Sequence, residues 1–234
     1  MAEVAGVEPT SAVLETVILP LNYAPNNSRQ IDYIMKLILS SCDFINENSK
    51  KVILDNLDKD LSEYKVLFIP NEKATKERIN SDKYYNRLKD DGFNRRKNIY
   101  VFDESRPDDF KNLDIDLIYV SGGNTFATLD KLRKCGFDKE IINYVKKGVT
   151  YIGGSCGAQI VTSDIKHVEA FDENYVGMKD YKGLCLFDGI MFCHYDESRE
   201  GKYKEVLNGK YKVYKLTNDD SIVVEDNNIK IYNK

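Results

Sequence analysis

A serine flanked by glycines has the spacing of a nucleophile elbow. Gly153, Ser155 and Gly157 form the pattern G-x-S-x-G, in which a sharp turn between a strand and a helix pushes one hydroxyl out above a sheet. The apolar run 149–152 predicts the strand, and residues 158–162 predict the helix. Glycines are needed because larger side chains would collide at such a turn. We therefore predict that Ser155 is a nucleophile for acyl transfer.

The neighbouring thiol is an alternative nucleophile. Cys156 follows Ser155, and a thiolate at the start of a helix is intrinsically the stronger nucleophile. The glycine register favours the serine, because Cys156 would be flanked by Gly154 and Ala158 rather than by two glycines. Thiol chemistry at Cys156 nevertheless stays open at this point.

A base for the serine must come from one of only two histidines. His194 follows the apolar run 189–192, so it lies at the exit of a predicted strand. A neutral imidazole in that place accepts the proton of Ser155 and later returns it to the leaving group. His167 sits in a charged stretch, and we predict that it is an exposed bystander.

Two carboxylates between the serine and the histidine are candidates for the acid that orients the imidazole. They are Glu169 and Asp172, and each could equally be a solvated surface charge. A second glycine pair, Gly122 and Gly123, follows the apolar run 115–120. Its free N–H groups could hold an oxyanion or a phosphate, but the pair could also be only a tight turn.

The elements that position these residues alternate along the chain. Apolar runs that read as buried strands are separated by segments with helical spacing, which is the pattern of an α/β fold with a mostly parallel sheet and helices on both faces. Three short strands close to one another at the end of the chain predict an antiparallel C-terminal edge. The strands are expected at 35–41, 66–70, 99–102, 115–120, 149–152, 189–192, 211–214, 221–225 and 229–231, and the helices at 48–57, 75–88, 125–134 and 138–147.

The composition of the first 34 residues differs from that of the rest. They are rich in Ala, Val, Pro and Thr, whereas the remainder is crowded with Lys, Asp, Asn and Tyr. We predict an extension over residues 1–34 and one folded domain over residues 35–234. The alternative is that Val17, Ile18 and Leu19 form a strand of the domain.

Charge and cysteine content exclude several classes of protein. With 34 Lys+Arg against 38 Asp+Glu, the net charge of −4 argues against nucleic acid as the main partner. The five cysteines are odd in number and contain no C-x-x-C, which excludes a disulfide framework that uses all of them and a zinc knuckle. No apolar run reaches the roughly 18 residues of a membrane span, and no signal peptide is recognisable. We expect a cytoplasmic protein without metal or cofactor.

Three motifs in order resemble the peptidase E family of serine peptidases. Members show G-G-N-T after one strand, Y-x-G-x-S-A-G after the next, and then a strand that ends in a histidine. The resemblance covers about residues 35–234 and implies a fold like that of the class I glutamine amidotransferases, which is flavodoxin-like. Here the motifs read G-G-N-T at 122–125, Y-I-G-G-S-C-G at 151–157 and F-C-H-Y at 192–195.

The resemblance implies a serine peptidase that hydrolyses small peptides through an acyl-enzyme. Glu169 is implied as the third member of the triad, with Asp172 in reserve, and a homodimer is the candidate assembly. The sequence departs from the family at Cys156, where members have Ala, and around the arginine that grips an acidic substrate. The implied site comprises Ser155 as nucleophile, His194 as base, the backbone of Gly123 and Cys156 as oxyanion donors, and Asn124 and Arg199 in substrate binding.

These departures keep two other functions under consideration. A protein with this fold could bind or regulate without hydrolysis, because a fold does not determine an activity. The other function under consideration is thiol chemistry at Cys156.

Overall fold

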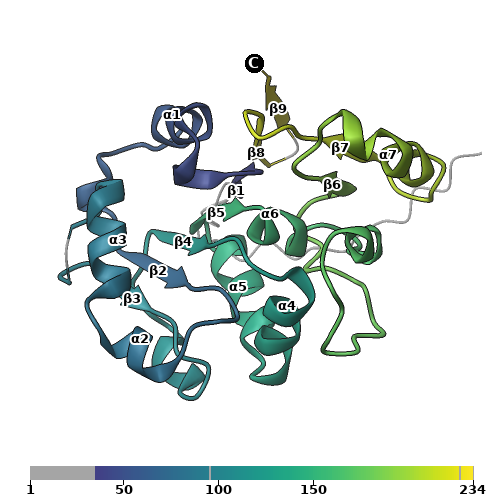
Figure 1. Cartoon of the computed structure of the whole chain (residues 1–234). Coiled ribbons are helices and arrows are strands. Elements are labelled where there is room, and N and C mark those ends of the chain that lie inside the picture. The colour runs from purple at the N-terminus through teal and green to yellow at the C-terminus, as the bar shows by residue number, and fades with distance from the viewer. Residues whose placement is uncertain (1–34, 95, 227, 234) are drawn as a thin grey trace, which may run out of the picture. The chain divides into compact units, whose positions relative to one another are not determined.

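The computed structural model describes residues 35–94, 96–226 and 228–233. The predicted extension over residues 1–34, with the alternative strand at 17–19, lies outside the described residues, so the division into extension and domain stays a prediction. Figure 1 shows the arrangement of the described elements.

A seven-stranded sheet forms the centre of the fold. Its first five strands pair in parallel in the order β3-β2-β4-β5-β1, and every residue of β2 and β4 is buried, as expected for strands covered on both faces. The parallel strands are β1 (Lys36–Ser40), β2 (Val66–Ile69), β3 (Ile99–Val101), β4 (Leu117–Val120) and β5 (Thr150–Gly154).

Helices cover both faces of this sheet. Two separate apolar clusters lie against it, one built with α1, α2 and α3 and the other with α4, α5 and α6. Figure 1 shows α1 and α3 at the upper left of the sheet and α4 and α5 at its lower right. The helices are α1 (Glu47–Asp55), α2 (Lys76–Asn80), α3 (Lys83–Asp91), α4 (Thr125–Lys134), α5 (Phe137–Lys146), α6 (Cys156–Ile160) and α7 (Glu200–Leu207).

The antiparallel C-terminal edge is confirmed for two of the three predicted strands. The hairpin of β8 (Ser221–Glu225) and β9 (Asn228–Tyr232) pairs antiparallel to β1 through β8. The third strand, β7 (Val213–Lys215), instead pairs in parallel with β6 (Ile190–Phe192) in a separate two-stranded sheet. The carboxyl ends of β6 and β7 therefore lie side by side.

The segment predicted as one helix over 75–88 forms two. Ser81 is extended, and its hydroxyl accepts the N–H of Lys83, which ends α2 and begins α3.

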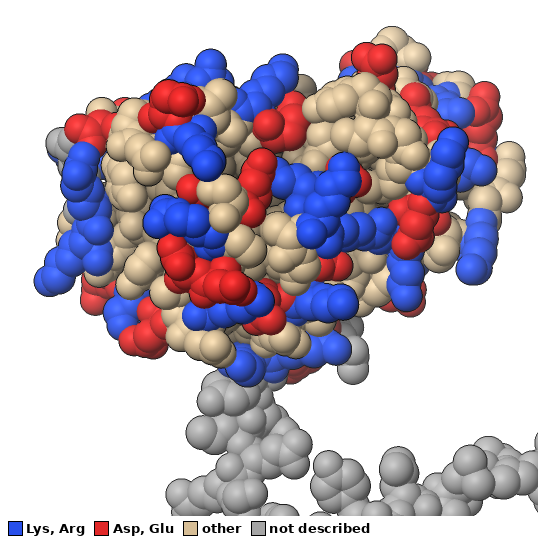
Figure 2. Space-filling model, turned by 90° about the horizontal axis from the view of Figure 1, so that it is seen from below, with Lys and Arg blue, Asp and Glu red and all other residues tan. Residues whose placement is uncertain are grey.

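On the face of the molecule seen in Figure 2, side chains of both charges are interspersed. Among the described helices, none is long and apolar enough to cross a membrane.

A buried polar network lies on the face covered by α3. Arg87 donates to the Tyr119 hydroxyl at 3.0 Å, and that hydroxyl donates to Asp43, whose pKa is raised by burial. Asp91 ends α3 close to Arg87, and one of its carboxylate oxygens is buried without a hydrogen-bond partner among the described residues. Burial raises the pKa of Asp91 from 3.8 to about 6.

Replacing Asp91 by Asn is expected to stabilise the protein at neutral pH. Because the folded pKa of Asp91 lies above its unfolded value, this carboxyl group lowers the stability of the wild-type protein progressively as the pH rises from 3.8 to about 6. A shift of about two units corresponds to about 3 kcal/mol, and solvent screening of this half-buried group reduces the gain to about 1 kcal/mol. Urea unfolding at about pH 5 and pH 8 measures it. The exposed neighbour Asp90→Asn is the matched control, and equal stability of D91N and D90N at pH 8 would contradict the account.

Candidate active site

Ser155 lies on a strained turn between β5 and α6. Its backbone has φ 50° and ψ −107°, a conformation that L-residues rarely adopt and that aims the side chain away from both elements. The N–H of Ser155 donates to the carbonyl of Ser40 at 2.8 Å, so the turn is attached to the end of β1. The strand and helix expected around G-x-S-x-G are both present, and the turn has the geometry of a nucleophile elbow.

The two glycines of the motif are required by close backbone contacts. A Cβ on Gly153 would lie 2.5 Å from the carbonyl oxygen of Gly157. A Cβ on Gly157 would lie 2.4 Å from the carbonyl oxygen of Val120 in β4. Both contacts are with backbone, which has no room to retreat, so the glycine register that favours the serine has a steric cause.

His194 follows β6 and faces the serine. Its Nε2 lies 2.9 Å from the Oγ of Ser155, a hydrogen-bond distance between nucleophile and base. The backbone N–H of His194 donates to the Oγ of Ser41 at 3.0 Å, and that hydroxyl donates to the carbonyl of Leu216. The ends of β1, β6 and β7 thus hold the backbone of His194 in place.

The group that orients the imidazole is an amide. Oδ1 of Asn218 lies 2.8 Å from Nδ1 of His194. Because an amide oxygen only accepts, Nδ1 carries the proton, and the lone pair of Nε2 faces Ser155. The sequence does not predict this role for Asn218, because the expected partner of the imidazole is an acid that lies between the serine and the histidine in the chain.

The structure does not bring the two predicted acids to His194. Glu169 lies in the 3₁₀ turn η4 (Lys166–Ala170) and accepts a hydrogen bond from the Tyr181 hydroxyl. Asp172 accepts the N–H of Thr125 at the start of α4, at 2.8 Å. The prediction that Glu169 orients the imidazole is therefore corrected: Asn218 occupies that place.

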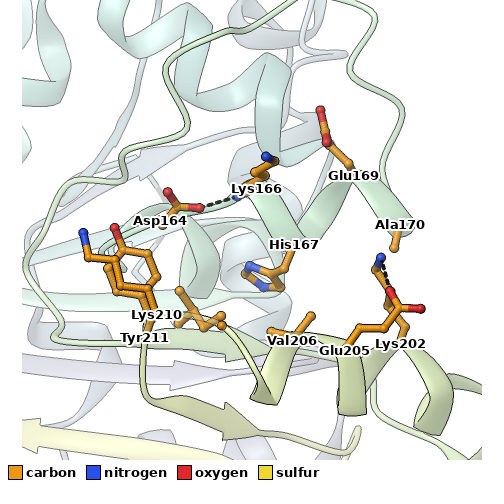
Figure 3. A pocket seen from close by; sticks show the side chains of 12 residues that line it. Asp164, Lys166, His167, Glu169, Ala170, Lys202, Glu205, Val206, Lys210 and Tyr211 are labelled. Atoms are coloured by element: carbon orange, nitrogen blue, oxygen red, sulfur yellow. Dashed lines mark hydrogen bonds and ion pairs between the residues drawn. The ribbon is translucent and has the colours of Figure 1, made fainter.

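His167 is buried rather than exposed, which corrects the second prediction for this segment. Its Nε2 lies 2.8 Å from the carbonyl oxygen of Met191, and burial lowers its pKa. It lines a cavity of about 420 Å³ that also has Glu169 at its rim. Figure 3 shows the Glu169 carboxylate turned away from the His167 ring. Neither Ser155 nor His194 lines this cavity.

The loop after β4 lies beside the serine and is called here the oxyanion loop (Ser121–Asn124). A Cβ on Gly122 would lie 3.5 Å from the Cβ of Ser155. Asn124 caps α4 by accepting the N–H of Ala127 at 2.9 Å, and its amide donates to the carbonyl of Glu173. The N–H of Gly123 has no hydrogen-bond partner within the described part of the chain, so it is available to a ligand.

The thiol beside the serine is an unsuitable nucleophile. Cys156 is fully buried, and burial raises its pKa to about 12. At neutral pH the group is a thiol, and the thiolate is the form that attacks. The backbone N–H of Cys156 lies at the start of α6.

Arg199 lies on the side of the site formed by His194. Its guanidinium donates to the carbonyl of Cys193 at 3.3 Å and stacks over the ring of Phe171, 4.4 Å from the centroid. Among the described residues no carboxylate lies within salt-bridge distance of Arg199. After the hydrogen bond from Ser198, the charge of Arg199 is one of the causes that lower the pKa of Asp196.

The described residues contain no group of three or more His, Cys, Asp or Glu side chains arranged to hold a metal ion. The hydroxyl of Ser155 and the imidazole of His194 lie at hydrogen-bond distance, which is the arrangement of nucleophile and base used in acyl transfer.

Comparison with known proteins relates the chain to peptidases. A peptidase of Listeria monocytogenes is 33% identical over 118 residues, which are 47% of this chain and 56% of that protein. Peptidase E of Escherichia coli is 31% identical over 101 residues, which are 39% of this chain and 43% of that protein. The chain thus matches about half the length of these curated relatives.

Two solved structures share the fold. A candidate peptidase E protein from Listeria monocytogenes EGD-e superposes with a TM-score of 0.66 at 22% identity, over 85% of this chain and 98% of that one. A peptidase from an acI-B1 Actinobacterium gives 0.58 at 16% identity, over 87% and 89%. The predicted fold class is confirmed. A profile of peptidase family S51 matches residues 36–232, nearly the whole described chain, so the chain belongs to peptidase family S51, as its resemblance to peptidase E predicts.

Proposed function

We propose that this protein is a serine peptidase that hydrolyses small peptides through an acyl-enzyme. The observation that carries the proposal is the 2.9 Å distance between the Oγ of Ser155 and Nε2 of His194, with the serine on a strained elbow. A structural serine and histidine have no need of that backbone conformation, which costs about 1–3 kcal/mol. Membership of peptidase family S51 supports the same reaction class.

In the proposed reaction the Oγ of Ser155 attacks the carbonyl carbon of the scissile bond, and Nε2 of His194 takes the serine proton. The negative charge that develops on the carbonyl oxygen is stabilised by the N–H groups of Gly123 and Cys156. His194 then returns the proton to the departing amine. A water molecule, activated by the same imidazole, hydrolyses the acyl-enzyme and regenerates Ser155.

Asn218 has a different role from the acid of a typical triad. Its amide oxygen holds the imidazole ring and fixes the tautomer, but it supplies no negative charge to the imidazolium that forms during the reaction. We therefore expect a catalytic centre that is correctly oriented but lacks the electrostatic support of a carboxylate. Cysteine peptidases with a Cys-His-Asn arrangement use an amide in the same place.

A substrate carboxylate is the natural partner for Arg199. The leaving group of the peptide departs on the side of His194, where this guanidinium lies, so Arg199 would bind the C-terminal carboxylate of a dipeptide. Asn124 supports the acyl side through its place in the oxyanion loop. We infer that the protein works in the cytoplasm, in keeping with five cysteines of which all are free.

The test is turnover of a panel of dipeptides that includes Asp-X members, by the wild-type protein and by Ser155→Ala. Hydrolysis by the wild type that is lost in the variant supports the proposal. No turnover of any member by a folded wild-type sample would favour a binding or regulatory role instead.

A further inference from the structure

The amide that orients the imidazole is carried by an exposed turn. Asn218 is exposed, so packing does not hold its side chain against His194. Asn218 and Asp219 form the centre of a turn that follows β7. Two hydrogen bonds close the turn: the N–H of Asp220 donates to the carbonyl of Thr217 at 3.4 Å, and the N–H of Thr217 donates to the Asp220 carboxylate at 2.8 Å. The place of the amide therefore depends on where the whole turn is held.

The carboxylate of Asp219 joins this turn to the start of α1. Its Oδ1 accepts hydrogen bonds from Nδ2 of Asn46 at 2.9 Å and from Nδ2 of Asn48 at 2.7 Å. Asn46 is the N-cap of α1, and its own Oδ1 accepts the N–H groups of Asn48 and Ser49. Because capping fixes the oxygen of the Asn46 amide, the direction of its nitrogen is fixed as well.

The segment that receives Asp219 also holds the nucleophile and the base. Residues 40–41, at the end of β1, accept the backbone N–H groups of Ser155 and His194. The segment 40–48 therefore fixes the nucleophile, the base and, through Asp219, the turn that carries the amide.

We infer that Asp219 is a positioning residue, which holds the amide of Asn218 against the imidazole of His194. It does so by joining the turn after β7 to the two amide groups at the start of α1. This inference rests on the proposed peptidase function, to which it adds a residue that does not itself touch the imidazole or the serine.

The charge of Asp219 offers a competing explanation. After burial and the charge of Asp43, the charge of Asp219 raises the pKa of Cys42, whose Sγ lies 4.0 Å from Nδ1 of His194. A carboxylate at this place would stabilise the imidazolium through its field alone, without positioning anything. The two explanations differ in what an uncharged side chain of the same shape does.

The test compares Asp219→Ala with Asp219→Asn. D219A is expected to lower kcat for the best dipeptide about tenfold with little change in KM, because a displaced amide misaligns the base. The amide oxygen of D219N still accepts from Asn46 and Asn48, so its kcat should stay within about twofold of wild type. Steady-state kinetics of the two variants measure this.

A double variant shows whether Asp219 acts through Asn218. Asn218→Leu already removes the amide, so the addition of Asp219→Ala should lower kcat no further. Asn48→Ala tests the same contact from the side of α1 and leaves the Asn46 cap in place. It should lower kcat in the same direction as D219A but by less, because one of the two donors to Asp219 remains.

The other end of α1 supplies the matched control. The hydroxyl of Tyr232 donates to Oδ1 of Asn56 at 3.2 Å, which joins the end of α1 to β9. Tyr232→Phe removes that hydrogen bond far from the turn and is expected to leave kcat unchanged.

NMR of the histidine ring nitrogens reads the position of the amide without any turnover. At about pH 8 both rings are neutral, and each tautomer is resolved by its nitrogen shifts. In wild type, His194 should carry its proton on Nδ1. His167 should carry its proton on Nε2, which faces the carbonyl of Met191, and is the internal reference. In D219A part of the His194 population should move its proton to Nε2, whereas D219N should match wild type.

Three results would overturn the inference. The first is a D219A variant that keeps both the kcat and the His194 tautomer of wild type. The second is a D219N variant that loses as much kcat as D219A, because the charge would then be the cause. The third is a multiplication of the losses of D219A and N218L in the double variant.

Failure of the proposed function has a different signature. A folded wild-type protein that neither turns over peptides nor reacts with a fluorophosphonate overturns that function. The tautomer of His194 in D219A and D219N still decides whether Asp219 positions the amide.

Discussion

Replacing Ser155 by alanine is expected to lower kcat for the best dipeptide by about 10⁴- to 10⁶-fold, since the variant cannot form the acyl-enzyme. His194→Ala should lose a similar amount, because the serine hydroxyl is a weak nucleophile without a base at Nε2, 2.9 Å away. The double variant should be no less active than either single one, since the two side chains act as one unit. Steady-state kinetics of the three variants, with folding checked by circular dichroism, measure this.

Comparing the double variant with the two single variants distinguishes a coupled pair of residues from two independent ones. If the losses of Ser155→Ala and His194→Ala multiplied in the double variant, the two groups would be acting separately. His167→Gln is the matched histidine control: its ring lies in another cavity, and kcat should not fall by more than a few-fold.

Replacing Asn218 by leucine is expected to lower kcat by about 10- to 100-fold, with little change in KM. Without the amide oxygen at 2.8 Å, the imidazole loses its orientation and its fixed tautomer, which gives up part of the roughly 10²- to 10⁴-fold contribution of general-base catalysis. Asn218→Asp should retain activity or increase it, because a carboxylate both orients the ring and stabilises the imidazolium. In N218D the acidic limb of the pH–rate profile should move to higher pH, since the carboxylate favours the protonated ring.

Glu169→Gln is the control for the two Asn218 variants, because Glu169 is the acid that the resemblance to peptidase E implies as the third member of the triad. Glu169 contacts Tyr181 and not His194, so E169Q should keep the wild-type kcat and pH profile. A loss in E169Q as large as that in N218L, or an N218L variant with full activity, would contradict the assignment of Asn218.

The elbow could be predicted from the sequence because its requirements are local. Backbone atoms lie within 2.5 Å of any Cβ added at Gly153 or Gly157. Only glycine fits at these two positions, so the spacing of a few residues is enough to predict the turn. The same holds for His194, which is one of only two histidines and follows an apolar strand. The parallel sheet could be predicted from runs such as Val66–Ile69, which are apolar throughout because both faces are covered.

Asn218 could not be found in this way, because its place depends on the pairing of two distant strands. The residues after β7 lie beside His194 only because β6 and β7 are parallel, with Phe192 opposite Lys215. The expected antiparallel edge at β7 would place the residues after β7 away from His194. A search for polar residues of any type after each strand, rather than for acids alone, would have included Asn218.

The prediction that His167 is exposed is wrong because its segment forms a 3₁₀ turn. Such a turn has three residues per turn, so Lys166 and Glu169 share its exposed face while His167 and Val168 point inward. The charged neighbours in the sequence suggested an exposed stretch, but they describe only one face of the turn. The same geometry carries Glu169 outward and away from His194.

The most direct test of the account is site-resolved labelling by a fluorophosphonate. The folded wild-type protein is incubated with the reagent, digested and analysed by mass spectrometry, alongside Ser155→Ala and Cys156→Ala. The account predicts one modified residue, Ser155, in wild type and in C156A, and no modification in S155A. Labelling of S155A at the same rate as wild type, or no labelling of a folded wild-type sample, would contradict the assignment of Ser155 as the nucleophile.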